Sequence, residues 1–127
     1  MNSLDGCLKR IMDIPGACSV TLVDGASGLA IATAGVHDVV DEHENAAGTT
    51  EVVRSALTCP ALAAGDDGKP TELVVLRPGA FHLLRLIDGD FDGRLFVHVV
   101  FDATTGNLGM ARYQLNSAVS ELTGAAR

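Results

Sequence analysis

Three apolar segments in the second half of the chain constrain the fold more than any other feature. They cover residues 71–77, 79–87 and 94–101, with Pro78-Gly79 at the first junction and residues 88–93 between the second and third segments. Each segment is apolar at successive positions and not only at alternate ones, which is typical of strands that are covered on both faces. The pattern predicts an antiparallel meander inside a layered domain, with helices from elsewhere in the chain on both faces.

Apolar residues recur at helical spacing in three other segments. The first predicted helix covers Asn2–Asp13 and stops at Ile14-Pro15-Gly16, because proline lacks a donor and glycine permits a turn. The second runs from Asp38, as its N-cap, to about residue 62, and the third begins at or just before Asn107. The stripe of the second helix expected to face the sheet consists of Val39, His43, Ala46, Thr50, Val53 and Leu57.

Residues 17–24 and 29–35 complete the predicted elements. They are rich in β-branched and small residues, and the turn at residues 25–28 joins them as a hairpin. The element order is then α-β-β-α-β-β-β-α. We therefore expect an α+β fold, a three-layer α/β/α sandwich with a five-stranded antiparallel sheet, in one domain over residues 1–127.

Charge and hydropathy exclude several classes of partner. The 127 residues carry 9 basic and 16 acidic side chains, a net charge of -7, so the chain has no general attraction for nucleic acid or an anionic membrane. No segment approaches the roughly 18 unbroken apolar residues of a membrane span. The N-terminal residues lack the basic and apolar regions of a signal peptide, and we expect a cytoplasmic protein.

The sequence offers no convincing catalytic, cofactor or metal site. The three cysteines, Cys7, Cys18 and Cys59, are widely spaced and are expected to be buried apolar residues. Asp88-Gly89-Asp90-Phe91-Asp92-Gly93 resembles half of a calcium loop, but Val99 stands where the bidentate glutamate belongs, so a hairpin turn is expected. His82 and His98 lie on neighbouring strands and can approach each other, yet no carboxylate or thiolate stands beside them.

Two features indicate association with a second chain. Residues 71–77 are predicted to be the outermost strand of the meander, and an exposed apolar edge is a pairing hazard unless something covers it. The second helix contains the run Ala46-Ala47-Gly48-Thr49-Thr50, and small residues let another backbone come close. Such a run serves either packing on the chain's own sheet or a helix–helix contact with a second copy or partner. Together the two features predict a homodimer.

The whole pattern resembles the roadblock / dynein light chain family. The resemblance spans residues 4–123 and rests on the element order and on several stretches. These are Leu8 through Gly35, with Ile14-Pro15-Gly16, Val20-Thr21-Leu22-Val23-Asp24 and Gly28-Leu29-Ala30-Ile31-Ala32; the strand pair from Phe81 to Phe101; and Asn107-Leu108-Gly109-Met110-Ala111-Arg112-Tyr113.

The resemblance implies a profilin-like fold without catalytic residues or cofactors. Such domains dimerise through the second helix and the third strand, and the bacterial members commonly act beside a small Ras-like GTPase as activators or scaffolds. The implied partners are therefore a second copy and such a GTPase. Arg54 is one candidate arginine finger, but it is rather expected to complement the end of the second helix. The dimer or partner interface is expected to comprise Val40, Glu44, Ala47, Gly48, Glu51, Val52, Ser55, Thr71, Leu73 and Val75.

Two other functions remain open at this point. A scaffold would bind a kinase or motor complex without regard to nucleotide. A ligand sensor would use a small pocket between the sheet and a helix, although the sequence shows no convergent polar groups for one.

Overall fold

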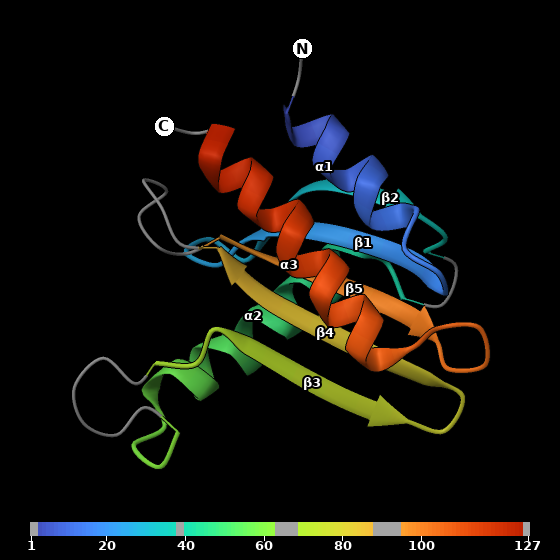
Figure 1. The fold of residues 1–127 in the computed structure, drawn as a ribbon. Coiled ribbons are helices and arrows are strands. Elements are labelled where there is room, and N and C mark those ends of the chain that lie inside the picture. The colour runs from blue at the N-terminus through green and yellow to red at the C-terminus, as the bar shows by residue number, and fades with distance from the viewer. Residues whose placement is uncertain (1–2, 38–39, 63–68, 88–94, 126–127) are drawn as a thin grey trace.

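A five-stranded antiparallel sheet in the order β2-β1-β5-β4-β3 forms the centre of the molecule (Figure 1). The computed structural model describes residues 3–37, 40–62, 69–87 and 95–125. The elements follow the predicted order. They are α1 (Ser3–Met12), β1 (Ala17–Asp24), β2 (Leu29–Gly35), α2 (Glu42–Thr58), β3 (Glu72–Arg77), β4 (Ala80–Ile87), β5 (Leu95–Asp102) and α3 (Leu108–Ala125).

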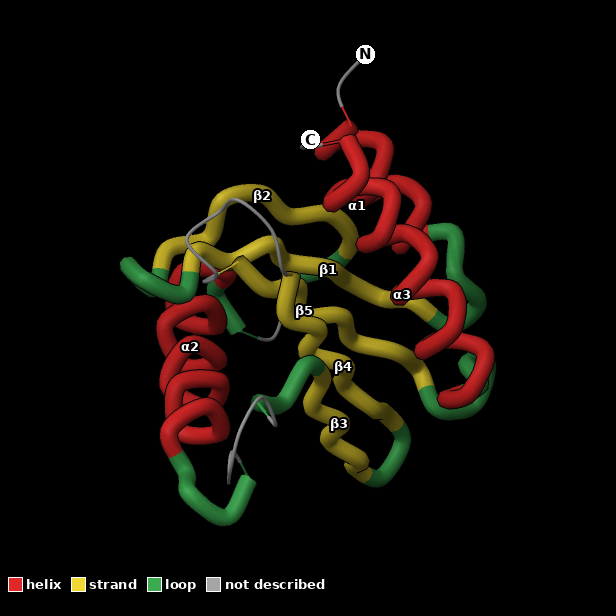
Figure 2. The backbone as a smooth tube through the Cα atoms, turned by 60° about the vertical axis from the view of Figure 1, so that its left-hand side comes forward, coloured by secondary structure: helices red, strands yellow, loops and turns green. Residues whose placement is uncertain are grey.

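The helices occupy both faces of the sheet, so the predicted three-layer sandwich is confirmed. Figure 2 shows α2 on one side and α1 with α3 on the other. The first and last helices lie side by side, and the exposed Arg10 and Glu121 form an ion pair between them. The meander of β3, β4 and β5 and the hairpin of β1 and β2 are both present, with β1 paired to β5.

The larger core cluster lies between the sheet and the pair α1 and α3. Odd and even positions of each strand point to opposite faces, so Val97, Val99 and Phe101 of β5 face this side. The Phe81 and Phe101 rings stack with centroids 4.8 Å apart. The helices contribute side chains at three- and four-residue spacing: Cys7, Leu8 and Ile11 from α1, and Ala111, Leu115, Ala118 and Val119 from α3.

The smaller cluster lies between the sheet and α2. Ala46 and Val53 of α2 pack with Val23, Leu84 and Phe96 of the sheet. α2 lies mainly over β1 and β2, also reaches β5 through Asn45 and His98, and leaves the exposed end of β3 without a helix above it. Helices therefore cover both faces of the inner strands, as expected, whereas Val74, Val75 and Leu76 near the end of β3 are exposed.

The first turn of α2 differs from the prediction. Asp41 is the N-cap, and its carboxylate accepts hydrogen bonds from the backbone N–H groups of His43 and Glu44 at 3.0 and 3.3 Å. With the helix starting there, the predicted stripe position His43 is exposed, whereas Thr50 and Val53 are buried as expected. Val39 and the predicted cap Asp38 lie outside the described residues. The helix ends at Thr58, directly before Cys59 and Pro60.

The other end positions agree with the sequence. The side-chain oxygen of Asn107 accepts from the N–H of Met110 at 2.8 Å and so caps α3. Cys7 is buried, but Cys18 is exposed, because β1 is irregular against β5 between Ala17 and Ser19. The segment Asp88–Gly93 lies outside the described residues. Among the helices that are described, none is long and apolar enough to cross a membrane.

Candidate functional site

The outward face of α2 gathers most of the predicted interface residues. Buried Ala46, Thr50, Val53 and Ala56 fix the inward face, and helical spacing then turns the opposite side to solvent. Val40, just before the helix, and Val52 are 43% and 49% exposed. The remaining predicted residues of this face are also exposed: Glu44, Ala47, Gly48, Glu51 and Ser55.

Gly48 is the residue on this face that the fold of the single chain explains least. A Cβ built on it would have no atom within 4 Å apart from its own helix neighbours, so packing on the sheet does not require a glycine there. Glycine inside a helix costs about 1 kcal/mol relative to alanine. The interpretation that Gly48 serves close packing on the chain's own sheet is therefore wrong, whereas Ala46 does pack there.

β3 is one of the two edge strands of the described sheet and the outermost strand of the meander, as predicted. It pairs with β4 on one side only, from Glu72↔Arg85 to Arg77↔Ala80. Val75 is 41% exposed and Leu76 is 70% exposed, so the strand presents apolar side chains beside an unpaired backbone. Of the other predicted residues, Leu73 is half-buried against the α2-side cluster, and Thr71 precedes the strand. An apolar edge of this kind is a template for a further strand.

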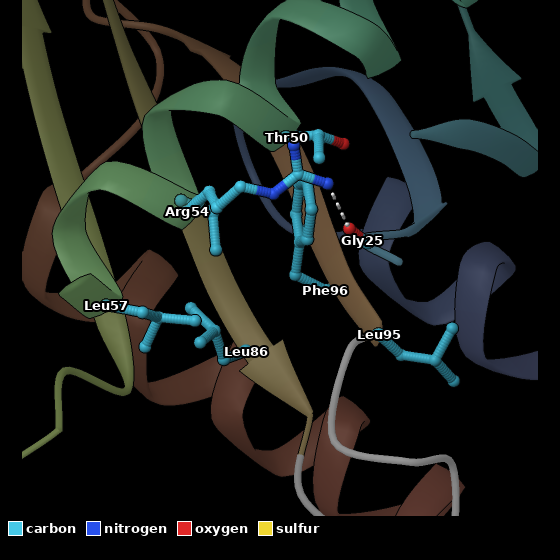
Figure 3. A pocket seen from close by; sticks show the side chains of 8 residues that line it. Gly25, Thr50, Arg54, Leu57, Leu86, Leu95 and Phe96 are labelled. Carbon is cyan, nitrogen blue, oxygen red and sulfur yellow. Dashed lines mark hydrogen bonds between the residues drawn. The ribbon is translucent and has the colours of Figure 1, made fainter. Parts of the chain in front are cut away.

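A small apolar hollow lies between the second half of α2 and the sheet (Figure 3). It has a volume of about 290 Å³, including space open to solvent, and is lined by Gly25, Thr50, Val53, Arg54, Leu57, Leu86, Leu95 and Phe96. The polar side chains among these already have partners. Thr50 donates its hydroxyl to the carbonyl of Ala46 at 2.7 Å, and Arg54 reaches across to the carbonyl of Gly25 at 3.3 Å.

Arg54 is held on the surface of its own chain. Besides Gly25 it contacts Glu51, with Nη1 and Oε2 at 2.9 Å. The expectation that it complements the end of the helix is wrong, because its guanidinium bridges α2 to the β1–β2 turn instead. This arrangement does not leave Arg54 extended toward a partner.

His82 and His98 meet on the α2 side of the sheet. Nδ1 of His82 and Nε2 of His98 are 2.8 Å apart, and the two rings stack with centroids 5.1 Å apart. Burial lowers the pKa of His98 to about 4, with His82 and His37 as further causes. Burial and the nearby Arg77 lower the pKa of His82 as well. Both histidines are therefore neutral near pH 7.

The partners of this histidine pair are not metal ligands. Arg77 donates Nε–H to Nε2 of His82 at 2.8 Å, and the side chain of Asn45 lies against Nδ1 of His98 at 3.1 Å. The sequence places the histidines on adjacent strands but gives no signal for Arg77 or Asn45, which come from β3 and α2. Among the described residues, no group of three or more histidines, cysteines or carboxylates is placed to hold a metal ion.

The combination of this sheet order with one helix on one face and two on the other is the roadblock/LC7 fold. No protein-family model matches the sequence, and no curated protein sequence does either. A roadblock/LC7 domain from Streptomyces avermitilis superposes with a TM-score of 0.70 at 14% identity, over 98% of this chain and 98% of that one.

Within that fold, the chain is similar to MglB. MglB of Myxococcus xanthus superposes with a TM-score of 0.83 at 22% identity, over 97% of this chain and 86% of that one. A form of MglB described as having a tetrameric arrangement superposes at 0.76 with 16% identity, over 95% of this chain and 85% of that one. At these identities the likeness establishes the fold.

Proposed function

We propose that the chain is a non-catalytic member of the roadblock / dynein light chain family that acts as a homodimer and regulates a small Ras-like GTPase. The observation that carries this proposal is that the chain has two exposed features together: the open edge of β3 and the outward face of α2 with Gly48. Neither feature serves the fold of a single chain. The MglB-like and roadblock/LC7-like architecture supports the same reading.

Strand geometry defines how the two copies of the proposed dimer would be arranged. Two copies of β3 related by a twofold axis can pair antiparallel only if the axis is perpendicular to the sheet. Such an axis leaves each face of the sheet on its own side, so both α2 helices lie on the same face of a ten-stranded sheet. The two exposed helix faces then form one composite surface in the dimer, next to the seam between the β3 strands.

Regulation would come from binding and not from chemistry. A partner shifts a conformational equilibrium only by its different affinity for the two states, so a dimer that prefers the ordered GTP-bound state would favour hydrolysis or recruitment. An arginine finger is not needed for this, and Arg54 is already engaged by Glu51 and Gly25. The carboxylate of Glu44 gives the proposed surface a negative charge, whereas that of Glu51 is paired with Arg54, and this charge favours a basic group on the partner.

The experiment is affinity capture of the tagged chain from its own cell extract, once with a GTP analogue and once with GDP. A small GTPase enriched in one nucleotide state supports the proposal and identifies the partner. A Gly48→Leu variant is expected to lose that GTPase, whereas a Gly6→Leu variant on the exposed side of α1 is expected to retain it.

The same experiment separates the alternatives. Capture of a kinase or motor complex, with no nucleotide-dependent GTPase, would replace this proposal with a scaffold role. A ligand sensor is less well supported, since Thr50 and Arg54 in the hollow already use their polar groups within the chain. Stabilisation by a small metabolite, with no protein partner, would favour the sensor.

A further inference from the structure

The four residues Asn45, His98, His82 and Arg77 form a continuous polar row, here called the histidine row. It begins on the first turn of α2, crosses β5 and β4, and ends on the edge strand β3. His98 is buried, His82 is half-buried and Arg77 is exposed. The row therefore connects the interior under α2 with the strand that the proposed function assigns to dimerisation.

The row fixes the position of Arg77 relative to the open edge. Its Nε–H donates to His82 of β4, which is the neighbour of β3 on the side away from that edge. The side chain of Arg77 thus lies back over its own sheet. Val75, on the same face of β3, is left beside the edge without a charged group across it.

The donors and acceptors along the histidine row match only if both histidines are neutral. A neutral imidazole has one N–H donor and one acceptor nitrogen. Since Arg77 donates to Nε2 of His82, the proton of His82 is on Nδ1 and is donated to Nε2 of His98. The proton of His98 is then on Nδ1, and the amide oxygen of Asn45 accepts it once the amide, whose nitrogen and oxygen are nearly isosteric, is turned by 180°.

Adding one proton to either imidazole ring breaks the hydrogen bond between Arg77 and His82. If His82 is protonated, its Nε2–H faces the Nε–H of Arg77 and the hydrogen bond is lost. If His98 is protonated, its Nε2–H needs an acceptor on His82, which moves the proton of His82 to Nε2, again against Arg77. Both cases place two donors face to face and add a positive charge beside a guanidinium.

Other charged groups around the row do not reverse this effect. His37, which follows β2, is near enough to His98 to disfavour its protonation, and Arg77 does the same for His82. The α2 residues that start the helix beside Asn45 are Asp41, whose carboxylate caps the helix, and the half-buried Glu42, which faces His43. The α1 and α3 helices lie on the opposite face of the sheet.

We propose that the histidine row is a pH-sensitive link that holds Arg77 away from the β3 edge while it is neutral and releases Arg77 toward that edge when it is protonated, which weakens binding of a second copy. The inference rests on the proposed homodimer. The released guanidinium is then free to reach the apolar seam, where it is desolvated or obstructs strand pairing, and the protonated imidazole adds a second cation to each copy. Two rows act in each dimer, so the dissociation constant responds to two protons.

The test is the dimer dissociation constant of the full chain by sedimentation velocity, from about pH 7.5 to about pH 4, with far-UV circular dichroism to confirm that the chain stays folded. We expect the constant to rise about fourfold or more, with most of the rise below about pH 5. An Arg77→Leu variant is expected to dimerise with no such pH response. A His82→Leu variant, which cannot hold Arg77, is expected to be weak at both pH values.

A matched control and a local readout separate the possible failures. His43→Gln removes an exposed histidine of α2 outside the row and is expected to keep the pH response. Nitrogen NMR of the imidazoles should show both row histidines with the proton on Nδ1 at pH 7.5. If the dissociation constant of the dimer does not change with pH, or falls in acid, this inference alone is overturned. A chain that is monomeric at pH 7.5 at every concentration overturns the homodimer, and this inference with it.

Discussion

Gly16 and Gly106 lie against each other where the chain enters β1 and where it leaves β5. A Cβ added to Gly16 would stand 2.5 Å from Cα of Gly106, and Gly16 has a φ of +89°. The carbonyl of Gly16 also accepts a hydrogen bond from the N–H of Asp102 at 2.8 Å. The glycine after Ile14-Pro15 therefore does more than permit a turn, because it lets two connections touch.

Replacing Gly16 by alanine should destabilise the fold strongly. A left-handed conformation costs a residue with a Cβ about 1–2 kcal/mol, and the backbone contact adds to this, so a loss of about 3 kcal/mol in the free energy of unfolding is expected. Gly79→Ala is the matched control, since Gly79 has a φ of +84° with no atom within 4 Å of the added Cβ. Urea unfolding should show a larger loss of the free energy of unfolding for Gly16→Ala than for Gly79→Ala. Equal losses would mean that the contact with Gly106 is unimportant.

Substitution of Gly48 should separate folding from association. Gly48→Ala is expected to raise the free energy of unfolding by about 1 kcal/mol, because the position is helical and open. Gly48→Leu should also fold well but dimerise or bind its partner less tightly, since the larger side chain projects from the outward face of α2. Gly6→Leu on α1 provides the comparison by sedimentation velocity. Unchanged dimerisation and partner binding of Gly48→Leu would mean that this face is not the interface.

A charge placed on the β3 edge should prevent dimerisation. Val75→Lys puts an ammonium group from each copy into an apolar seam, and we expect the dissociation constant to rise about 100-fold or more. Leu29→Lys is the control on β2, the other edge strand, where Leu29 is 62% exposed. Light scattering should find the first variant monomeric and the second dimeric. A dimeric Val75→Lys chain would place the interface elsewhere.

The stability of the monomer should depend on pH through His98. Its pKa is about 4 in the folded chain and about 6.5 when unfolded, so the unfolded state binds more protons between these values. The free energy of unfolding should therefore have its full value above about pH 6.5 and should fall by up to about 3 kcal/mol as the pH decreases to about 4.

Urea unfolding at protein concentrations low enough to keep the chain monomeric should show this loss. Under the same conditions, His98→Gln should be less stable near pH 7 but lose less stability in acid, while His43→Gln should keep the original dependence on pH. An equal slope in the His98→Gln chain would assign the acid sensitivity to other groups.

Arg54 should be dispensable for stimulated GTP hydrolysis by a captured GTPase. Its guanidinium is engaged by Glu51 and Gly25, and both contacts are exposed, so Arg54→Ala should cost less than about 1 kcal/mol of stability. Hydrolysis measured with the variant should stay within about twofold of that with the unchanged chain. A loss of about 1000-fold would identify Arg54 as an arginine finger after all.

Local patterns were sufficient to predict the elements of this fold. The hairpin strands have the predicted bounds, and the three later strands begin one residue after the predicted ones, because β-branched runs and turn residues mark them clearly. The start of α2 was less predictable. Asp38 and Asp41 are both suitable N-caps, and only the position of the helix on the sheet decides between them.

The candidate site was predictable in outline only. Helical spacing places Gly48 and Val52 on the outward face of α2, and a strand order inferred from short connections places β3 at the edge. The histidine row could not be predicted, because it requires the β4–β5 register, the position of α2 and the side-chain direction of Arg77 together. Each of these is set by packing between segments that are distant in the sequence.

The single open edge of β3 also limits which chains can be partners. In an antiparallel pair, directly opposite side chains point to the same face, so two identical strands must be centred on a residue that meets its own counterpart. In β3 the central residue is one of Leu73, Val74, Val75 and Leu76, and all four are uncharged. A related chain with lysine at the centre would repel its own copy and accept only one with a carboxylate there. The choice between self-association and a mixed pair can thus be decided by one side chain.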